Sequence, residues 1–118
     1  ELLCLQHRER IAALLGFSGI QYRAGPWFRH GRRGVMEGVQ LDLVFDRADR
    51  VLTVCEAKYR KEPVGVEIID EMEKKLARIP EFGARTIQKV LITRSEPTAE
   101  LQRTSYLGRI IRARELMA

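Results

Sequence analysis

The chain has 118 residues, of which 45% are hydrophobic and 31% charged, and its formal net charge is +5. This length supports one core but not two, and the composition excludes an intrinsically disordered chain. No segment approaches the roughly 20 apolar residues that cross a bilayer, and no signal-peptide pattern is visible. Two cysteines make no disulfide framework. We therefore expect a cytoplasmic protein with no membrane partner, whose positive charge permits nucleic-acid binding without requiring it.

Apolar residues recur at helical spacing over residues 2–15, and Gly16 ends this predicted helix. Because the chain starts within this pattern and without methionine, we expect residues 1–118 to be a single domain of a longer protein. Residues 20–28 combine β-compatible side chains with Gly25-Pro26, which predicts an irregular or edge strand. The glycine-containing basic segment 29–34 is predicted to be a loop.

Two strands are predicted next, over residues 38–46 and 50–59, joined by a turn of hairpin length. Helical spacing follows over residues 66–79 and ends before Pro80. Residues 86–93 are typical of a buried strand, 96–102 of a short helical turn, and 106–112 of a last strand. This order of helix, three strands, helix, strand and a further strand predicts an α/β (mixed α+β) fold, with a central mixed sheet flanked by helices.

Two carboxylates and a lysine lie within the apolar patterns of the two adjacent strands: Asp42 on the first, and Glu56 and Lys58 on the second. Charges at such positions are costly unless they bind something. Alternate residues of a strand share a face, so Glu56 and Lys58 project to the same side, and Asp42 joins them if the strands pair.

Asp42, Glu56 and the backbone carbonyl of Ala57 would then offer hard oxygen ligands to Mg²⁺ or Mn²⁺. A bound ion of this kind lowers the pKa of a water molecule and stabilises charge on a phosphate. Lys58 would orient that water or neutralise the developing charge. These groups together match the hydrolysis of a phosphodiester.

Spacing alone leaves alternatives open. The three charged residues also suit the exposed face of an edge sheet, as solvated cross-strand ion pairs. The basic residues Arg29, His30, Arg32 and Arg33 either clamp a nucleic-acid backbone or form a solvated loop. The aromatic pair Trp27-Phe28 beside them either stacks on bases or packs into the core.

Asp42, followed after a hairpin by Glu56-Ala-Lys58, resembles the PD-(D/E)XK nuclease superfamily, and the element order is similar to its restriction endonuclease-like core. More narrowly, residues 1–7, 38–47 and 52–59 resemble a domain found at the C-terminus of bacterial AAA-type ATPases. The resemblance implies that Asp42, Glu56 and Lys58 take the catalytic positions. It also places Glu1 where many members carry a first-helix glutamate that completes the metal site.

The same resemblance implies nucleic acid, in the first place DNA, and an N-terminal ATPase domain as partners, with a homodimer as a further option. The chain itself contains no P-loop, so we expect no nucleotide binding by this domain. Because the superfamily includes inactive members, a catalytically silent DNA-binding or regulatory module of the ATPase is the alternative to a nuclease.

Overall fold

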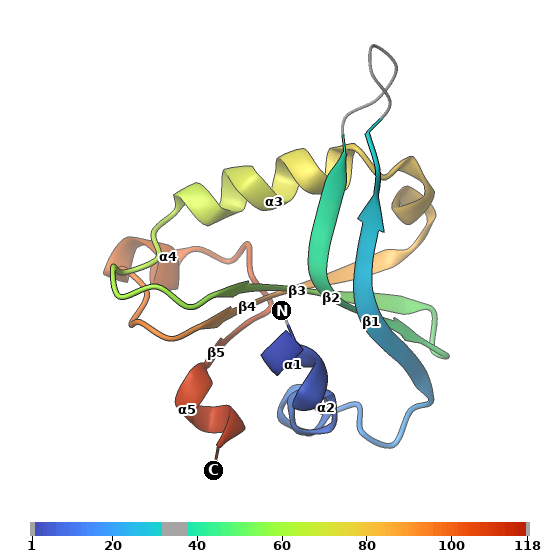
Figure 1. The fold of residues 1–118 in the computed structure, drawn as a ribbon, viewed down its shortest axis with the longest axis horizontal. Helices are drawn as coiled ribbons and strands as arrows, with labels where there is room; N and C mark the ends of the chain where they lie inside the picture. Colours follow the sequence, from blue (N-terminus) through green and yellow to red (C-terminus); the bar gives the residue numbers. More distant parts are fainter. Residues whose placement is uncertain (1, 32–37, 118) are drawn as a thin grey trace.

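The structure is a computed structural model that describes residues 2–31 and 38–117, with helices on both faces of a five-stranded sheet (Figure 1). The strands lie side by side in sequence order; the first three are antiparallel and the last three parallel. The mixed α/β fold predicted from the element order is thus confirmed. The strands are β1 (Tyr22–Arg29), β2 (Val39–Arg47), β3 (Val51–Lys58), β4 (Thr86–Thr93) and β5 (Arg109–Arg112).

One face of the sheet is covered by α1 (Leu2–Gln6), α2 (Arg8–Leu15) and α5 (Ala113–Leu116). The single helix predicted over residues 2–15 is wrong in one respect, because it is divided at His7, where φ is −105° and ψ is 20°. The helix ends as predicted at Gly16, whose φ of 84° is the left-handed conformation that glycine adopts without strain. The other face is covered by α3 (Glu67–Ala77), the 3₁₀ helix η1 (Pro80–Ala84) and α4 (Ala99–Arg103).

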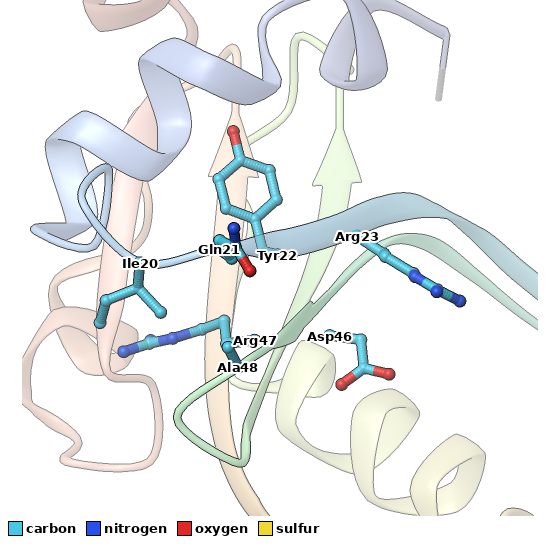
Figure 2. A pocket seen from close by; sticks show the side chains of 7 residues that line it. All are labelled: Ile20, Gln21, Tyr22, Arg23, Asp46, Arg47 and Ala48. Carbon is cyan, nitrogen blue, oxygen red and sulfur yellow. The ribbon is translucent and has the colours of Figure 1, made fainter.

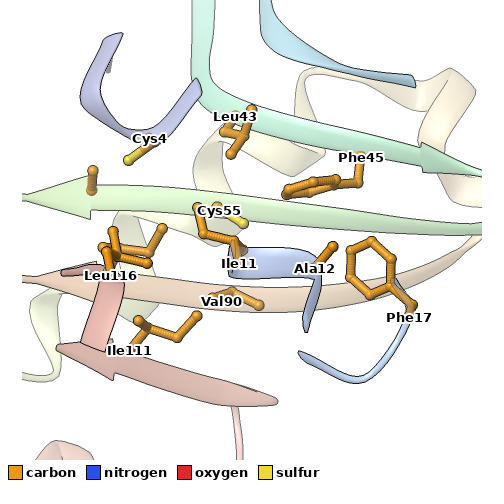
Figure 3. Packing of buried hydrophobic residues seen from close by; sticks show 12 residues of the cluster. Cys4, Ile11, Ala12, Phe17, Leu43, Phe45, Cys55, Val90, Ile111 and Leu116 are labelled. Atoms are coloured by element: carbon orange, nitrogen blue, oxygen red, sulfur yellow. The ribbon is translucent and has the colours of Figure 1, made fainter. Parts of the chain in front are cut away.

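The sheet separates two apolar cores, and the alternation along β3 decides which side chain enters which core. Cys55 and Ala57 face α1, α2 and α5, in a core that also contains Phe45 and Phe17. Figure 3 shows Cys55 and the two phenylalanines of this core. Val54 faces α3 and packs in the opposite core. Glu56 and Lys58 therefore project toward α3, on the side that strand periodicity predicts. Cys4 and Cys55 are both buried, and neither forms a disulfide.

A β-bulge bends β2 near its middle. Gly25 of β1 pairs with Val44, but Trp27 pairs with Leu41, so three steps along β2 match two along β1. The ladder between β2 and β3 runs only from Leu43–Cys55 to Asp46–Leu52. A bulge bends its strand and increases the local twist. Figure 1 accordingly shows the first half of β2 rising with β1 away from β3 and past α3.

None of the helices in the described ranges is both long enough and apolar enough to cross a membrane.

Candidate functional site

The bulge places Asp42 at the point where β2 separates from β3. The backbone N–H of Ala57 donates a hydrogen bond of 2.9 Å to Asp42 Oδ2. Beyond the end of the β2–β3 ladder, this side chain thus takes the place of a backbone carbonyl as acceptor. The sequence predicted that pairing of the two strands would bring Asp42 beside Glu56, and the register agrees, since one step beyond the Leu43–Cys55 pair sets Asp42 opposite Glu56. The N–H and C=O of one strand residue point to the same side of the strand. The carbonyl of Ala57 therefore also faces β2, on the side of Asp42.

Glu56 is buried, with only 2% of its surface exposed. Its Oε2 accepts a hydrogen bond of 2.9 Å from Lys75 Nζ, whereas its buried Oε1 has no hydrogen-bond partner among the described residues. Burial raises the pKa of Glu56, the charge of Asp42 adds to this, and Lys75 and Lys58 oppose it. The alternative of a solvated ion pair on an exposed sheet face is wrong for Glu56, because β3 is a central strand covered by α3.

Lys58 and Glu56 both find their partners on α3. Lys58 Nζ lies 3.0 Å from Glu71 Oε1, and Glu71 stands one helical turn before Lys75. Sequence analysis missed both α3 residues, although a signal was present. Each follows a buried apolar residue, Ile68 or Met72, by three positions, and residues at this spacing share one side of a helix.

Asp42, Glu56 and Lys58 line one pocket of about 310 Å³, so the three predicted catalytic residues do come together. Lys75 in the last turn of α3 and Arg78, which follows that helix, bring two further cations to this pocket. We call it the carboxylate pocket. Its full lining is Gly38, Val39, Gln40, Asp42, Glu56, Ala57, Lys58, Lys75 and Arg78.

The carboxylate pocket offers two carboxylates to a metal ion. Across the described part of the chain, no group of three or more His, Cys, Asp or Glu side chains could hold a metal. Glu1, the predicted third carboxylate, lies outside the described residues. Mg²⁺ is usually held by one or two carboxylates and keeps several waters. The unpartnered Oε1 of Glu56, the carboxylate of Asp42 and the Ala57 carbonyl thus fit a hard divalent cation.

Of the four basic residues predicted to clamp a nucleic-acid backbone, the structure describes two, Arg29 and His30. Arg29 is not in a loop but is the last residue of β1, and its guanidinium pairs with Glu81 at 2.5 Å. His30 follows and is exposed. Arg32 and Arg33 lie outside the described residues. Arg29 must therefore exchange Glu81 for a phosphate if it is to bind a nucleic-acid backbone.

A second pocket, of about 570 Å³, lies at the far end of β2 and includes Ile20, Arg23 and Arg47 (Figure 2). Arg47 is already bound within the fold: it pairs with Asp49 at 2.6 Å and lies over the Phe17 ring at 4.2 Å. Its guanidinium links Asp49, in the turn between β2 and β3, to Phe17, which follows α2, so we assign Arg47 a structural role.

The sheet and its two helical layers define the chain as a mixed α/β protein. A solved structure, the crystal structure of a protein of unknown function AF1548, is similar to it, with a TM-score of 0.58 and 19% sequence identity. The match covers 92% of this chain and 56% of that chain, so this chain spans little more than half the length of that neighbour. No protein-family model and no curated protein matches the sequence. At this identity the likeness supports the fold alone.

Proposed function

We propose that this domain is a metal-dependent nuclease-like domain that hydrolyses phosphodiester bonds of nucleic acids in the carboxylate pocket. One observation carries the proposal: Glu56 is buried with an Oε1 that has no partner among the described residues, and it lines the same pocket as Asp42, which accepts a hydrogen bond from the Ala57 N–H. A buried carboxylate without a full set of partners destabilises the fold. Such groups concentrate at functional sites, where their charge is used.

Each residue has a distinct part in this proposal. Asp42, Glu56 and the Ala57 carbonyl would hold Mg²⁺ or Mn²⁺, which when bound lowers the pKa of a water molecule and stabilises charge on a phosphate. The Lys58 ammonium, oriented by Glu71, donates to a phosphate oxygen. Lys75 balances part of the charge of Glu56.

The wider assignment follows the resemblance to the C-terminal domain of AAA-type ATPases. The partners would be DNA in the first place and an ATPase domain of the same protein, in the cytoplasm, with a homodimer as a further option. Arg29, His30, Arg32 and Arg33 would contact the backbone of the nucleic acid.

The test is cleavage of end-labelled single-stranded and duplex DNA and of RNA in the presence of Mn²⁺. Asp42→Asn and Lys58→Met should abolish cleavage while leaving the fold intact. Lys74→Met is the matched control, because the Lys74 side chain is 70% exposed and pairs only with Asp70 of its own helix among the described residues. Equal cleavage by wild type and Asp42→Asn, or no cleavage of any substrate by the wild type, contradicts the proposal.

A second function is favoured by the ion pairs of the pocket. Lys75 binds Glu56 and Lys58 binds Glu71, so the charges are largely balanced without a metal. This arrangement suits a catalytically silent module that binds DNA or regulates the ATPase. Such a module should keep DNA binding in Asp42→Asn and lose it when Arg29 and the basic residues beyond it are neutralised.

A further inference from the structure

Phe28 is exposed although it lies within a strand. The neighbouring Trp27 packs on Phe82, with ring centroids 5.4 Å apart, and belongs to the core on the α3 side. Phe28 projects to the other side of β1 and is 60% exposed. A single exposed hydrophobic residue is ordinary, so a role for Phe28 has to be argued from what surrounds it.

The imidazole of His30 and a further pocket, distinct from the one that contains Arg47, lie beside the Phe28 ring. His30 is two residues further along, and its ring lies 5.2 Å from that of Phe28 at an interplanar angle of 75°. Because the rings are nearly perpendicular, His30 does not stack flat on Phe28. Both side chains, with Arg29 and Gln40, line a pocket of about 350 Å³, which we call the aromatic pocket.

The aromatic pocket adjoins the carboxylate pocket. Gly38, Val39 and Gln40 line both of them. Gln40 pairs with Phe28 across the strands and precedes Asp42 by two residues, about 7 Å along a strand. These three residues thus join a site for a phosphate, on the α3 side of the sheet, to a site for a flat apolar group on the opposite side of β1 and β2.

Gly38 brings the two chain segments of the aromatic pocket together. A Cβ at this position would lie 3.1 Å from the backbone nitrogen of Gly31 and 3.3 Å from the carbonyl oxygen of Arg29. These contacts are with backbone atoms, which cannot rotate away as a side chain does. Glycine at position 38 thus permits the close approach that forms one wall of the pocket.

We propose that Phe28, supported by His30, is the stacking site for an unpaired nucleobase of a single-stranded nucleic acid whose neighbouring phosphate lies in the carboxylate pocket. This inference rests on the proposed function and narrows its substrate class. Bases inside a duplex cover one another's faces, so an aromatic ring can stack only on a base that is unpaired or at an end. Cations for the phosphates line both pockets: Arg29, Lys58, Lys75 and Arg78. Arg29, Lys58 and Lys75 are paired with Glu81, Glu71 and Glu56, so a bound phosphate would replace these carboxylates as their partner.

The test is fluorescence anisotropy in EDTA with labelled oligothymidylate, oligouridylate and a duplex of the same length. Phe28→Ala and Phe28→Leu should weaken single-strand binding roughly 5- to 150-fold, the loss expected for one stacked base. Phe28→Tyr should bind like wild type, because it keeps the ring. Met117→Ala is the matched control, since Met117 is also a large exposed hydrophobic residue, at 66%. The two single-stranded probes show whether DNA or RNA is preferred.

An abasic oligomer isolates the stacking contact. Wild type and Phe28→Ala should bind it equally, because it keeps the phosphates and lacks the bases. Three results would each overturn the inference. They are undiminished single-strand binding by Phe28→Leu, tighter binding to the duplex than to either single strand, and no single-strand binding by wild type. Because EDTA removes the metal, failure here is distinguishable from failure of the nuclease proposal, which the cleavage assay measures separately.

Discussion

Replacing Lys75 with methionine should destabilise the protein by about 2–3 kcal/mol at neutral pH. Lys75 Nζ lies 2.9 Å from Glu56 Oε2, and only 3% of the Glu56 side chain is exposed. Removing one partner of a buried ion pair costs about 3–5 kcal/mol. The Lys75 side chain is 28% exposed, so solvent screens the pair, and the expected loss in the free energy of unfolding lies below that range. Methionine keeps the apolar stem of lysine, so the substitution removes mainly the charge.

The deficit of Lys75→Met should depend on pH in a defined direction. Burial raises the pKa of Glu56 above its ordinary value of 4.5, and the substitution removes the main opposing group. For an acid with a raised folded pKa, the cost of ionisation appears as pH rises from 4.5 through that pKa and is complete above it. The deficit should therefore shrink as pH falls toward 4.5, in urea unfolding curves recorded at several pH values.

Metal should substitute for the missing ammonium group. Saturating Mn²⁺ should raise the stability of Lys75→Met, but it should not change that of the double variant Lys75→Met/Glu56→Gln, in which the carboxylate is absent. Lys74→Met, on the exposed side of the same helix, is the control. The reasoning is refuted if Lys75→Met matches wild type at neutral pH, or if its deficit persists unchanged in the Glu56→Gln background.

Three further predictions concern the same strands. Asp42→Ala should cost about 1–3 kcal/mol in urea unfolding, because the Ala57 N–H loses its acceptor; Asp42→Asn keeps an acceptor oxygen and should cost clearly less, and equal losses would contradict this. Mn²⁺ affinity of the wild type should fall as pH drops through the raised pKa of Glu56, since the metal binds the ionised carboxylate; a pH-independent affinity in calorimetry would place the metal elsewhere. Thr53→Val should lower stability by about 1 kcal/mol in thermal unfolding, because it removes the hydrogen bond of 2.8 Å that the buried Thr53 hydroxyl donates to Gln88 Oε1, while Arg47 still donates to the same oxygen at 3.3 Å; an unchanged midpoint would contradict a stabilising role for the Thr53 hydroxyl.

Much of the site follows from strand periodicity. The alternation of apolar residues along β3 predicts that Glu56 and Lys58 share a face, and both do contact α3. The flanking apolar runs predict burial of Glu56, which is confirmed at 2% exposure. These features are local, so a single sequence contains them.

The manner in which Asp42 is held could not be predicted. Asp42 accepts a hydrogen bond from the Ala57 N–H where the ladder between β2 and β3 ends and the bulge between β1 and β2 lies, and both features are set by how strands register with each other rather than by the residues at one position. The same limit applies to Lys75 and Glu71. Their helical spacing is visible in the sequence, but the packing of α3 over β3 decides that they meet Glu56 and Lys58. The split of the first helix at His7 likewise left no clear sequence signal, since no proline or glycine is present there.

A calorimetric titration with Mn²⁺, on the wild type and on Asp42→Asn, tests the central claim most directly. The proposed site predicts that Mn²⁺ binds the wild type and that binding is lost or greatly weakened in Asp42→Asn, with both proteins folded. Equal binding by the two proteins, or none by the wild type, would contradict a metal site formed by Asp42 and Glu56.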